Sequence, residues 1–413
     1  MTTPRLTSIL RPIFAVAALA LLCATVASAV ATETVLYSFT DGSDGAWPKG
    51  TLTMDANGNL YGTAQYGGNT PGCSGCGTVF ELTPNGDGTW NYQVIHTFND
   101  MDGAGPLAGV VFDTHGNLYG TTAFGGSYQS GNVFELSPNP DGSWSETVLY
   151  TFTGGADGSQ PCSAVTLDSA GNVFGTTPLG GAFGGGVVFK LTNSNGTWTE
   201  STIYNFSGAA GAHPSSKINF DSAGNAYGTA SSGGTSGGGV VYELSQGNGG
   251  NWNATVLHSF TGKVDGSAPN GLVFDSTGNL YGGAAGGGST KNCDYGCGTI
   301  FALHPSNGSW QFRVLHYFRG APATTPTGDL RFDAFGHLWG TTSGVGVNSL
   351  GNVFELARVA GKWKYGVVYT FGQGNGGTVP YSGVVFDAAG NAFGTTTSNV
   401  GCYLCGVVYE ITP

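Results

Sequence analysis

Charged residues are scarce in this sequence, and basic residues are the scarcest of them. Of 413 residues only 13 are lysine or arginine, against 25 aspartates and glutamates. No run or cluster of basic residues is present that could neutralise phosphate groups. The sequence therefore argues against nucleic acid and anionic lipid as partners, and its acidic balance favours solubility.

Two further features are missing: a sustained helical period, and a long apolar run beyond the N-terminus. At the N-terminus, "IFAVAALALLCATVA" follows Arg5 and Arg11 and precedes Ala27-Ser28-Ala29. A basic end, an apolar core shorter than a membrane span and small residues at a cleavage site are typical of a secretory signal. We predict a signal peptide over residues 1–29, a secreted or periplasmic mature chain, and no membrane segment in that mature chain.

Glycine is abundant, at 74 residues with 17 prolines, which approaches the composition of low-complexity disorder. However, 12% of the residues are aromatic, and the apolar residues fall in short regular clusters. A disordered chain lacks such clusters. The composition therefore indicates a folded protein that is rich in turns.

One ten-residue phrase recurs seven times, for example as "FDTHGNLYGT" and "FDSTGNLYGG". The aspartates that mark it are Asp55, Asp113, Asp168, Asp221, Asp275, Asp333 and Asp387. Their spacing, close to 54 residues, is near that of propeller blades. Each period contains four strand-like runs, A to D, such as "AGVVFD", "NLYGTT", "NVFELSP" and "SETVLYTF". The "DxxGN" element predicts the A–B hairpin turn, with Asp capping it and Gly in the left-handed conformation.

The two ends of the chain supply parts of one blade. The first D strand, Thr34–Phe39, precedes any A strand, and the last period stops after its C strand, Val407–Ile411. The sequence therefore predicts an all-β fold over residues 34–413: a seven-bladed β-propeller of four-stranded blades, closed by the N-terminal strand pairing with the last blade. Closure removes exposed sheet edges, and we expect a monomer.

The run "GNLYGTTAFGGSYQSGNVFELSP" resembles the tandem Gloeobacter/Verrucomicrobia-type repeat, called GloVer, of bacterial secreted proteins. Matching runs start at Gly58, Gly116, Gly171, Gly224, Gly278, Gly336 and Gly390. The resemblance implies secretion and a propeller-like fold. It implies no catalytic residues.

Candidate ligand-binding residues lie in the loops that a propeller gathers on one face, the D–A and B–C loops. Four D–A loops carry an aspartate four residues before a proline: Asp44, Asp102, Asp157 and Asp265. These are either turn residues or a partial ring of carboxylates that binds Ca²⁺ or sugar hydroxyls. Tyr66 and Phe124, at the edges of B–C loops, either stack on sugar rings or pack within the loops.

Six cysteines form close pairs in three B–C loops: Cys73/Cys76, Cys293/Cys297 and Cys402/Cys405. In an oxidising compartment the pairs predict one short disulfide in each loop. An alternative is a Cys₄ zinc site made by the first and last pairs, because the first and last blades are neighbours in the ring. Cys162 is left over, and we expect a buried thiol.

No motif identifies a catalytic residue, a metal site or a cofactor. The leading hypothesis is a secreted, non-enzymatic binding or scaffold propeller that contacts an extracellular glycan or protein through its D–A/B–C face. One alternative is a Ca²⁺-dependent propeller hydrolase or lyase that uses the four loop aspartates. Another is a structural protein of the cell envelope.

Overall fold

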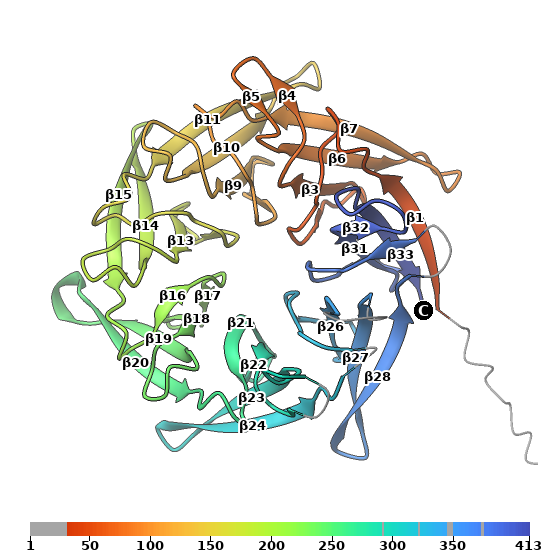
Figure 1. Cartoon of the computed structure of the whole chain (residues 1–413). Coiled ribbons are helices and arrows are strands. Elements are labelled where there is room, and N and C mark those ends of the chain that lie inside the picture. The colour runs from red at the N-terminus through yellow and green to blue at the C-terminus, as the bar shows by residue number, and fades with distance from the viewer. Residues whose placement is uncertain (1–30, 291–292, 321–322, 345–349, 373–375) are drawn as a thin grey trace, which may run out of the picture. The chain divides into compact units, whose positions relative to one another are not determined.

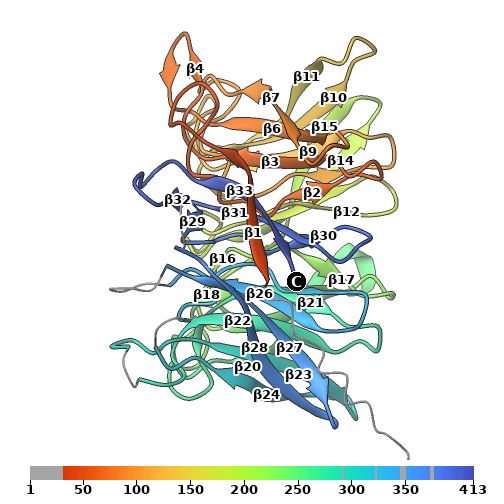
Figure 2. The ribbon, with the colours of Figure 1, turned by 90° about the vertical axis from the view of Figure 1, so that its right-hand side faces the viewer.

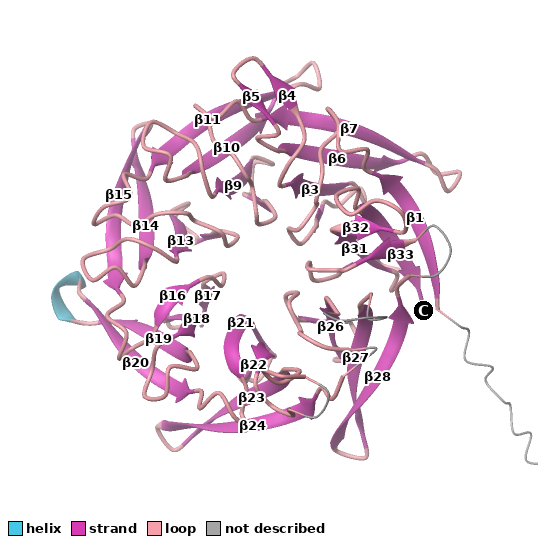
Figure 3. Ribbon diagram, in the orientation of Figure 1, coloured by secondary structure: helices cyan, strands magenta, loops and turns pink. Residues whose placement is uncertain are grey.

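Almost every regular element that the structure describes is a strand. The structure is a computed structural model, and it describes residues 31–413 except 291–292, 321–322, 345–349 and 373–375. The predicted signal peptide, residues 1–29, lies outside the described residues. The strands form seven antiparallel sheets, each built on four strands and arranged around a centre (Figures 1 and 3). The predicted seven-bladed propeller is confirmed.

The A strands are the innermost strands of their blades: β2 (Thr53–Met54), β8 (Val111–Phe112), β12 (Thr166–Leu167), β17 (Asn219–Phe220), β21 (Ser267–Phe274), β25 (Arg331–Phe332) and β30 (Val385–Phe386). The B strands are β3 (Leu60–Ala64), β9 (Leu118–Thr122), β13 (Val173–Thr177), β18 (Ala226–Ser232), β22 (Leu280–Gly286), β26 (Leu338–Thr342) and β31 (Ala392–Thr396).

The C strands are β6 (Thr78–Pro84), β10 (Asn132–Pro138), β14 (Val187–Ser194), β19 (Val240–Gln246), β23 (Thr299–Ser306), β27 (Asn352–Val359) and β33 (Val407–Thr412). The outermost D strands are β7 (Trp90–Thr97), β11 (Trp144–Thr151), β15 (Thr197–Asn205), β20 (Trp252–Ser259), β24 (Ser309–Tyr317), β28 (Lys362–Thr370) and β1 (Thr32–Ser38). Short elements in loops and turns are β4 (Asn69–Thr70), β5 (Cys73–Ser74), β16 (Ala212–Pro214), β29 (Gly377–Thr378), β32 (Ser398–Asn399) and the 3₁₀ turn η1 (Asn248–Gly250).

The ring is closed by the N-terminal strand, as predicted. β1 pairs antiparallel with β33, from Thr32 opposite Thr412 to Ser38 opposite Val407. The strand begins two residues earlier than the expected Thr34. It completes the sheet β1-β33-β31-β30, so both ends of the described chain lie in one blade.

Seven hydrophobic clusters fill the seven contacts between neighbouring blades. The cluster between the last and first blades includes Phe393 and Val408 from one side and Leu52 and Phe80 from the other. The other six clusters join the remaining neighbours in order round the ring. The hydrophobic core of this protein is therefore divided into inter-blade layers, and closure buries the outer faces of the first and last blades.

Packing and hydrogen bonding explain why glycine followed by threonine recurs in the B strands. A Cβ on Gly120 of β9 would lie 2.4 Å from the ring of Phe134, its partner in β10, so the aromatic side chain occupies the space that a larger residue would need. The next residue, Thr121, donates a hydrogen bond of 3.1 Å to the carbonyl of Ser163 in the following blade. At ring closure Thr395 bonds in the same way to the carbonyl of Gly50.

These inter-blade bonds also explain a difference from expectation. The A strands were expected to run over about six residues, but six of the seven span only two. The preceding carbonyls, such as that of Ala108, accept hydrogen bonds from the B strand of the neighbouring blade. Those backbone groups are therefore satisfied outside their own sheet.

The A–B turns have the predicted construction. Asp113 accepts hydrogen bonds from the backbone N–H groups of His115 and Asn117 and from the Asn117 side chain. Gly116 has φ of 88°, in the left-handed region that glycine tolerates best. No helix in the described part of the chain has the length and apolar character that a membrane crossing needs.

Candidate functional site

The D–A and B–C loops lie together at one end of the sheets and are called the loop face below; the A–B and C–D turns form the turn face. Isolated bridges join the two kinds of loop directly: Ala46 pairs with Tyr66, Ala104 with Phe124 and Ser159 with Leu179. Figure 2 shows the ring from the side, with the loop strands β4, β29 and β32 on one side of it. The loops of each blade therefore form one continuous surface.

Exposed large apolar side chains are concentrated on the loop face. Sixteen such side chains are exposed among the described residues, and eleven of them belong to D–A or B–C loops: Tyr66, Met101, Phe124, Tyr128, Leu179, Phe183, Val264, Tyr295, Leu350, Val400 and Tyr403. The turn face carries only two, Phe335 and Val359. Exposed apolar side chains that are concentrated on one face are typical of an interaction site.

Every D–A loop places the residue before its proline in the left-handed backbone region. The seven residues are Trp47, Gly105, Gln160, His213, Ala268, Thr325 and Val379. Each donates its backbone N–H to a B–C loop carbonyl of the preceding blade, as Trp47 does to Leu404 at 3.0 Å. Left-handed backbone at non-glycine residues costs about 1–3 kcal/mol and persists where surrounding contacts enforce it. These bonds fix the D–A loops, while their side chains differ from blade to blade.

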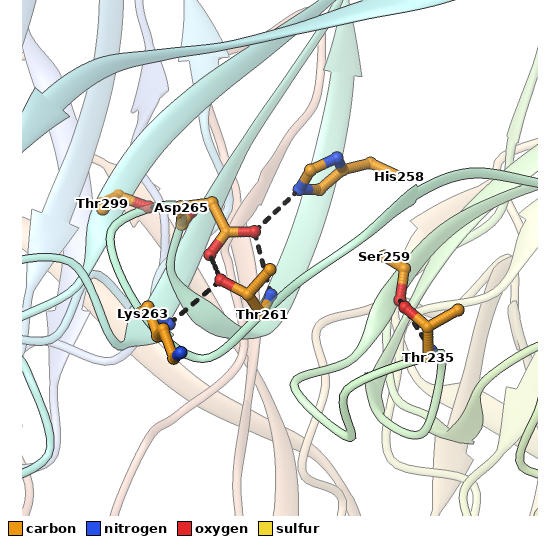
Figure 4. Close-up of polar contacts among 7 residues, drawn as sticks. All are labelled: Thr235, His258, Ser259, Thr261, Lys263, Asp265 and Thr299. Atoms are coloured by element: carbon orange, nitrogen blue, oxygen red, sulfur yellow. Dashed lines mark hydrogen bonds and ion pairs between the residues drawn. The ribbon is translucent and has the colours of Figure 1, made fainter.

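The four predicted loop aspartates each bond to residues of their own loop or of the D strand that precedes it. Asp265 accepts hydrogen bonds from the backbone and the hydroxyl of Thr261 and from His258 Nε2 at 3.2 Å (Figure 4). Burial raises the pKa of Asp265, but these hydrogen bonds outweigh burial and lower it overall. In the same way Asp44 accepts hydrogen bonds from Thr40 and Tyr37, Asp157 from Thr153 and Tyr150, and Asp102 from the backbone and side chain of Asn99. His96 Nε2 lies 3.4 Å from Asp102.

The structure does not gather these carboxylates into a shared site. Within the described residues, no group of three or more His, Cys, Asp or Glu side chains is placed to hold a metal ion. The observed bonds are those of the turn-residue interpretation, which was one of the two alternatives that the sequence left open.

Tyr66 and Phe124 occupy equivalent places on the loop face. Tyr66 is 37% exposed and stacks on Trp47, with ring centroids 5.4 Å apart. Phe124 is 40% exposed and lies over Gly105, the residue equivalent to Trp47 in the next blade. Both rings therefore pack on the loops with one side and remain accessible on the other.

The three predicted disulfides are present. They join Cys73 to Cys76, Cys293 to Cys297 and Cys402 to Cys405, with Cα–Cα distances of 5.9, 5.4 and 5.2 Å. These bonds exclude the alternative zinc site, because a zinc ligand would be a free thiolate.

Two of the disulfides close small loops that carry strongly exposed tyrosines. Tyr295 is 92% exposed and lies between Cys293 and Cys297. Tyr403 is 75% exposed and lies between Cys402 and Cys405. Sequence reasoning identified the disulfides but not these tyrosines, although their position inside the cysteine pairs was visible.

A channel of about 790 Å³ runs along the inner strands. Its lining includes Lys49, Lys217 and Arg331, and the single carboxylate among its lining residues is Asp329. Sequence reasoning missed these residues. A comparison of equivalent positions after the loop prolines would have found them, because each of these three positions is basic in one blade only.

Lys49 and Cys162 face each other at the channel wall. Burial lowers the pKa of Lys49, and its ammonium lies 5.2 Å from the centre of the Tyr381 ring. Burial raises the pKa of Cys162 to about 11, although the nearby Lys49 charge works in the opposite direction. Cys162 is a free, partly buried thiol. At neutral pH it is therefore protonated and a weak nucleophile.

The sequence matches the Gloeobacter/Verrucomicrobia repeat over residues 24–168 and 115–294. No curated protein has a sequence that matches this chain significantly.

Several solved structures are similar in fold. A Bacteroides uniformis protein named as a 6-phosphogluconolactonase aligns over 76% of this chain and 83% of its own, with 15% identity and a TM-score of 0.50. A protein of the same name from Bacteroides fragilis aligns over 84% and 86%, with 15% identity and a TM-score of 0.51. The extracellular domain of a B. thetaiotaomicron one-component system aligns over 90% of this chain and 40% of its own, with 11% identity and a TM-score of 0.54. At such identities the similarity concerns the fold alone.

Proposed function

The chain belongs to the Gloeobacter/Verrucomicrobia repeat family, and we propose that it is a non-enzymatic binding or scaffold propeller, secreted or periplasmic, whose loop face contacts an extracellular glycan or protein. Three disulfides suit an oxidising compartment. The acidic chain has no basic surface run for nucleic acid. The protein would act as a monomer, because ring closure leaves no blade without a neighbour.

The observation that carries this proposal is the unequal distribution of exposed apolar side chains. Eleven of the sixteen lie on the loop face. Tyrosine and phenylalanine offer large contact area and can stack on sugar rings or fill pockets of a protein partner. The loops that present them are bonded to neighbouring blades and, in three cases, closed by disulfides. Little conformational freedom is then lost on binding, which favours affinity.

The arrangement of the loop carboxylates favours binding over hydrolysis. A general acid and base must face one reacting group together, whereas each loop aspartate accepts hydrogen bonds from its own Thr or Asn neighbours. Two structural neighbours carry the name of a lactonase, but at 15% identity they share only the fold with this chain and do not support a lactonase activity for it.

The proposal is tested by retention on arrays of extracellular glycans and cell-envelope proteins. The test variant is Tyr295→Ala with Tyr403→Ala, and its matched control is Phe335→Ala, an equally exposed aromatic of the turn face at 83% exposure. We expect the double variant to weaken retention about tenfold or more, as loss of interface aromatics does, and the control to bind as the parent protein. Retention that survives in the double variant but fails in Phe335→Ala would place the contact on the turn face and refute the proposal.

A further inference from the structure

Three cationic side chains converge on the central channel from three different blades. Lys49, Lys217 and Arg331 stand one, three and five residues after the D–A loop prolines Pro48, Pro214 and Pro326. Side chains of extended backbone alternate between two sides with a period of two residues. The three positions therefore share the side that faces the channel, at successive levels along it.

These cations are not neutralised by the protein. None of the three forms an ion pair with a carboxylate of the described residues. The ion pairs among those residues all join a histidine to an aspartate or glutamate. Asp329, the one acidic residue of the lining, accepts a hydrogen bond of 3.1 Å from the Thr51 hydroxyl. The lining therefore has two more basic than acidic residues, although the whole chain has a net charge of −12.

The fold does not need positive charge at these places. In other blades the position of Lys217 is taken by Thr51, Gly109, Ala164, Asp329 or Gly383, and these blades have the same strands. Like charges that face a common space repel one another. The three cations give the channel of this acidic protein a locally positive lining, which would attract an anion.

The rest of the lining is rich in neutral hydroxyl and amide groups. Thr53, Ser163, Ser215, Asn219 and Thr327 belong to it. Thr53, Asn219 and Thr327 already donate hydrogen bonds to backbone carbonyls, which leaves their side-chain oxygens to accept hydrogen bonds from a polyhydroxylated molecule. The volume of about 790 Å³ falls in the range of small-molecule sites.

The geometry points to the channel as a binding site for a small polyhydroxylated carboxylate, that is, an acidic sugar. Lys217 and Arg331 would contact its carboxylate, and the hydroxyl and amide side chains would contact its hydroxyl groups. This site is separate from the contact of the loop face with a macromolecule. The test of the channel site and the test of the loop-face contact are therefore independent of each other.

Calorimetric titration with galacturonate tests the inference, and galactose serves as the ligand that lacks the carboxylate. We expect measurable galacturonate binding, at least tenfold weaker binding of galactose, and weakening of galacturonate binding with added salt. Lys217→Met and Arg331→Met should each weaken galacturonate binding about tenfold. Lys364→Met, which removes an exposed lysine of the outer strand β28, should leave it unchanged.

The alkylation rate of Cys162 provides a second measure of binding that is independent of calorimetry. Cys162 lines the same channel, so bound galacturonate should slow its alkylation by the uncharged reagent iodoacetamide, and galactose should not. Equal binding of the two sugars, no binding of either, or full affinity in both Met variants would overturn the inference. Inorganic phosphate binding as tightly as galacturonate would also overturn it, because the hydroxyl contacts would then contribute nothing.

Discussion

The phenolic hydroxyl of Tyr369 donates a hydrogen bond of 2.9 Å to Glu33 Oε2. Tyr369 belongs to β28 of the sixth blade and Glu33 to β1, the strand that closes the ring. Glu33 also accepts the backbone N–H of Gly377 at 2.9 Å. One carboxylate thus joins the N-terminal strand to the blade before it, in addition to the pairing of β1 with β33.

We expect Tyr369→Phe to destabilise the protein by about 1–2 kcal/mol, because it removes a hydrogen bond to a carboxylate that is partly shielded from water. Tyr204→Phe is the matched control. Tyr204 occupies the equivalent position in the third blade, where the neighbouring D strand offers Ala254 in place of a glutamate. Chemical denaturation of the two variants checks the prediction. Equal stability of Tyr369→Phe and the parent protein would mean that this contact does not contribute to closure.

The repeat made most of the fold predictable. Seven aspartates at even spacing predicted seven blades, and a D strand without an A strand before it predicted closure by β1. The channel cations were not predicted, because each stands at a position that is not basic in the other blades. Their local sequence also contains no motif that indicates a binding site. Their convergence depends on the ring, which brings Lys49 and Arg331 together from positions 282 residues apart. The left-handed backbone of Gln160 and its equivalents was missed for a related reason. It depends on a bond to the neighbouring blade.

Asp157 provides a test between the turn and calcium interpretations. It accepts the backbone N–H of Thr153 at 2.7 Å and the Tyr150 hydroxyl at 3.0 Å. Asp157→Ala should therefore lower the melting temperature, by the equivalent of about 1–3 kcal/mol, to the same extent with and without Ca²⁺. A melting temperature that calcium raises in the parent protein, and not in Asp157→Ala or Asp102→Ala, would instead support the calcium-dependent alternative.

The cysteines predict a simple labelling pattern. Without reductant, iodoacetamide should label Cys162 and no other cysteine of residues 31–413, because the remaining six are in disulfides. The rate should rise about tenfold per pH unit from pH 7 to 10, since the thiolate reacts and the pKa of Cys162 is about 11. Peptide mapping with Cys162→Ala as the control checks both points. Several labelled cysteines would contradict the disulfide assignment.

His316 predicts a loss of stability in mild acid. Its ring stacks on Tyr365, 4.0 Å away, and burial followed by the charge of Arg319 lowers its pKa from 6.5 to about 4. The equivalent His258 stacks on Phe312, and burial lowers its pKa as well, although the hydrogen bond and the charge of Asp265 oppose the shift. A histidine with a lowered folded-state pKa binds a proton more readily in the unfolded chain. Its contribution to stability is complete above pH 6.5 and decreases as the pH falls toward 4.

His316→Tyr should reduce this pH dependence, because tyrosine occupies the same position in four other blades and does not titrate between pH 5 and pH 7. In one of these blades Tyr37 stacks on Tyr92, as His316 stacks on Tyr365. We expect the parent protein to lose about 1–2 kcal/mol more than the variant between pH 7 and pH 5, after allowance for partial exposure of the ring. Denaturation curves at the two pH values measure the difference. Parallel losses in both proteins would assign the acid sensitivity to other groups.

Hydroxyl-radical footprinting of the protein, free and bound to the partner captured on the arrays, tests the loop-face proposal most directly. Tyr66, Tyr295 and Tyr403 on the loop face should become protected on binding, while Phe335 on the turn face should be labelled equally in both states. Protection of Phe335 with unchanged labelling of the three tyrosines would contradict the assignment of the loop face as the contact surface.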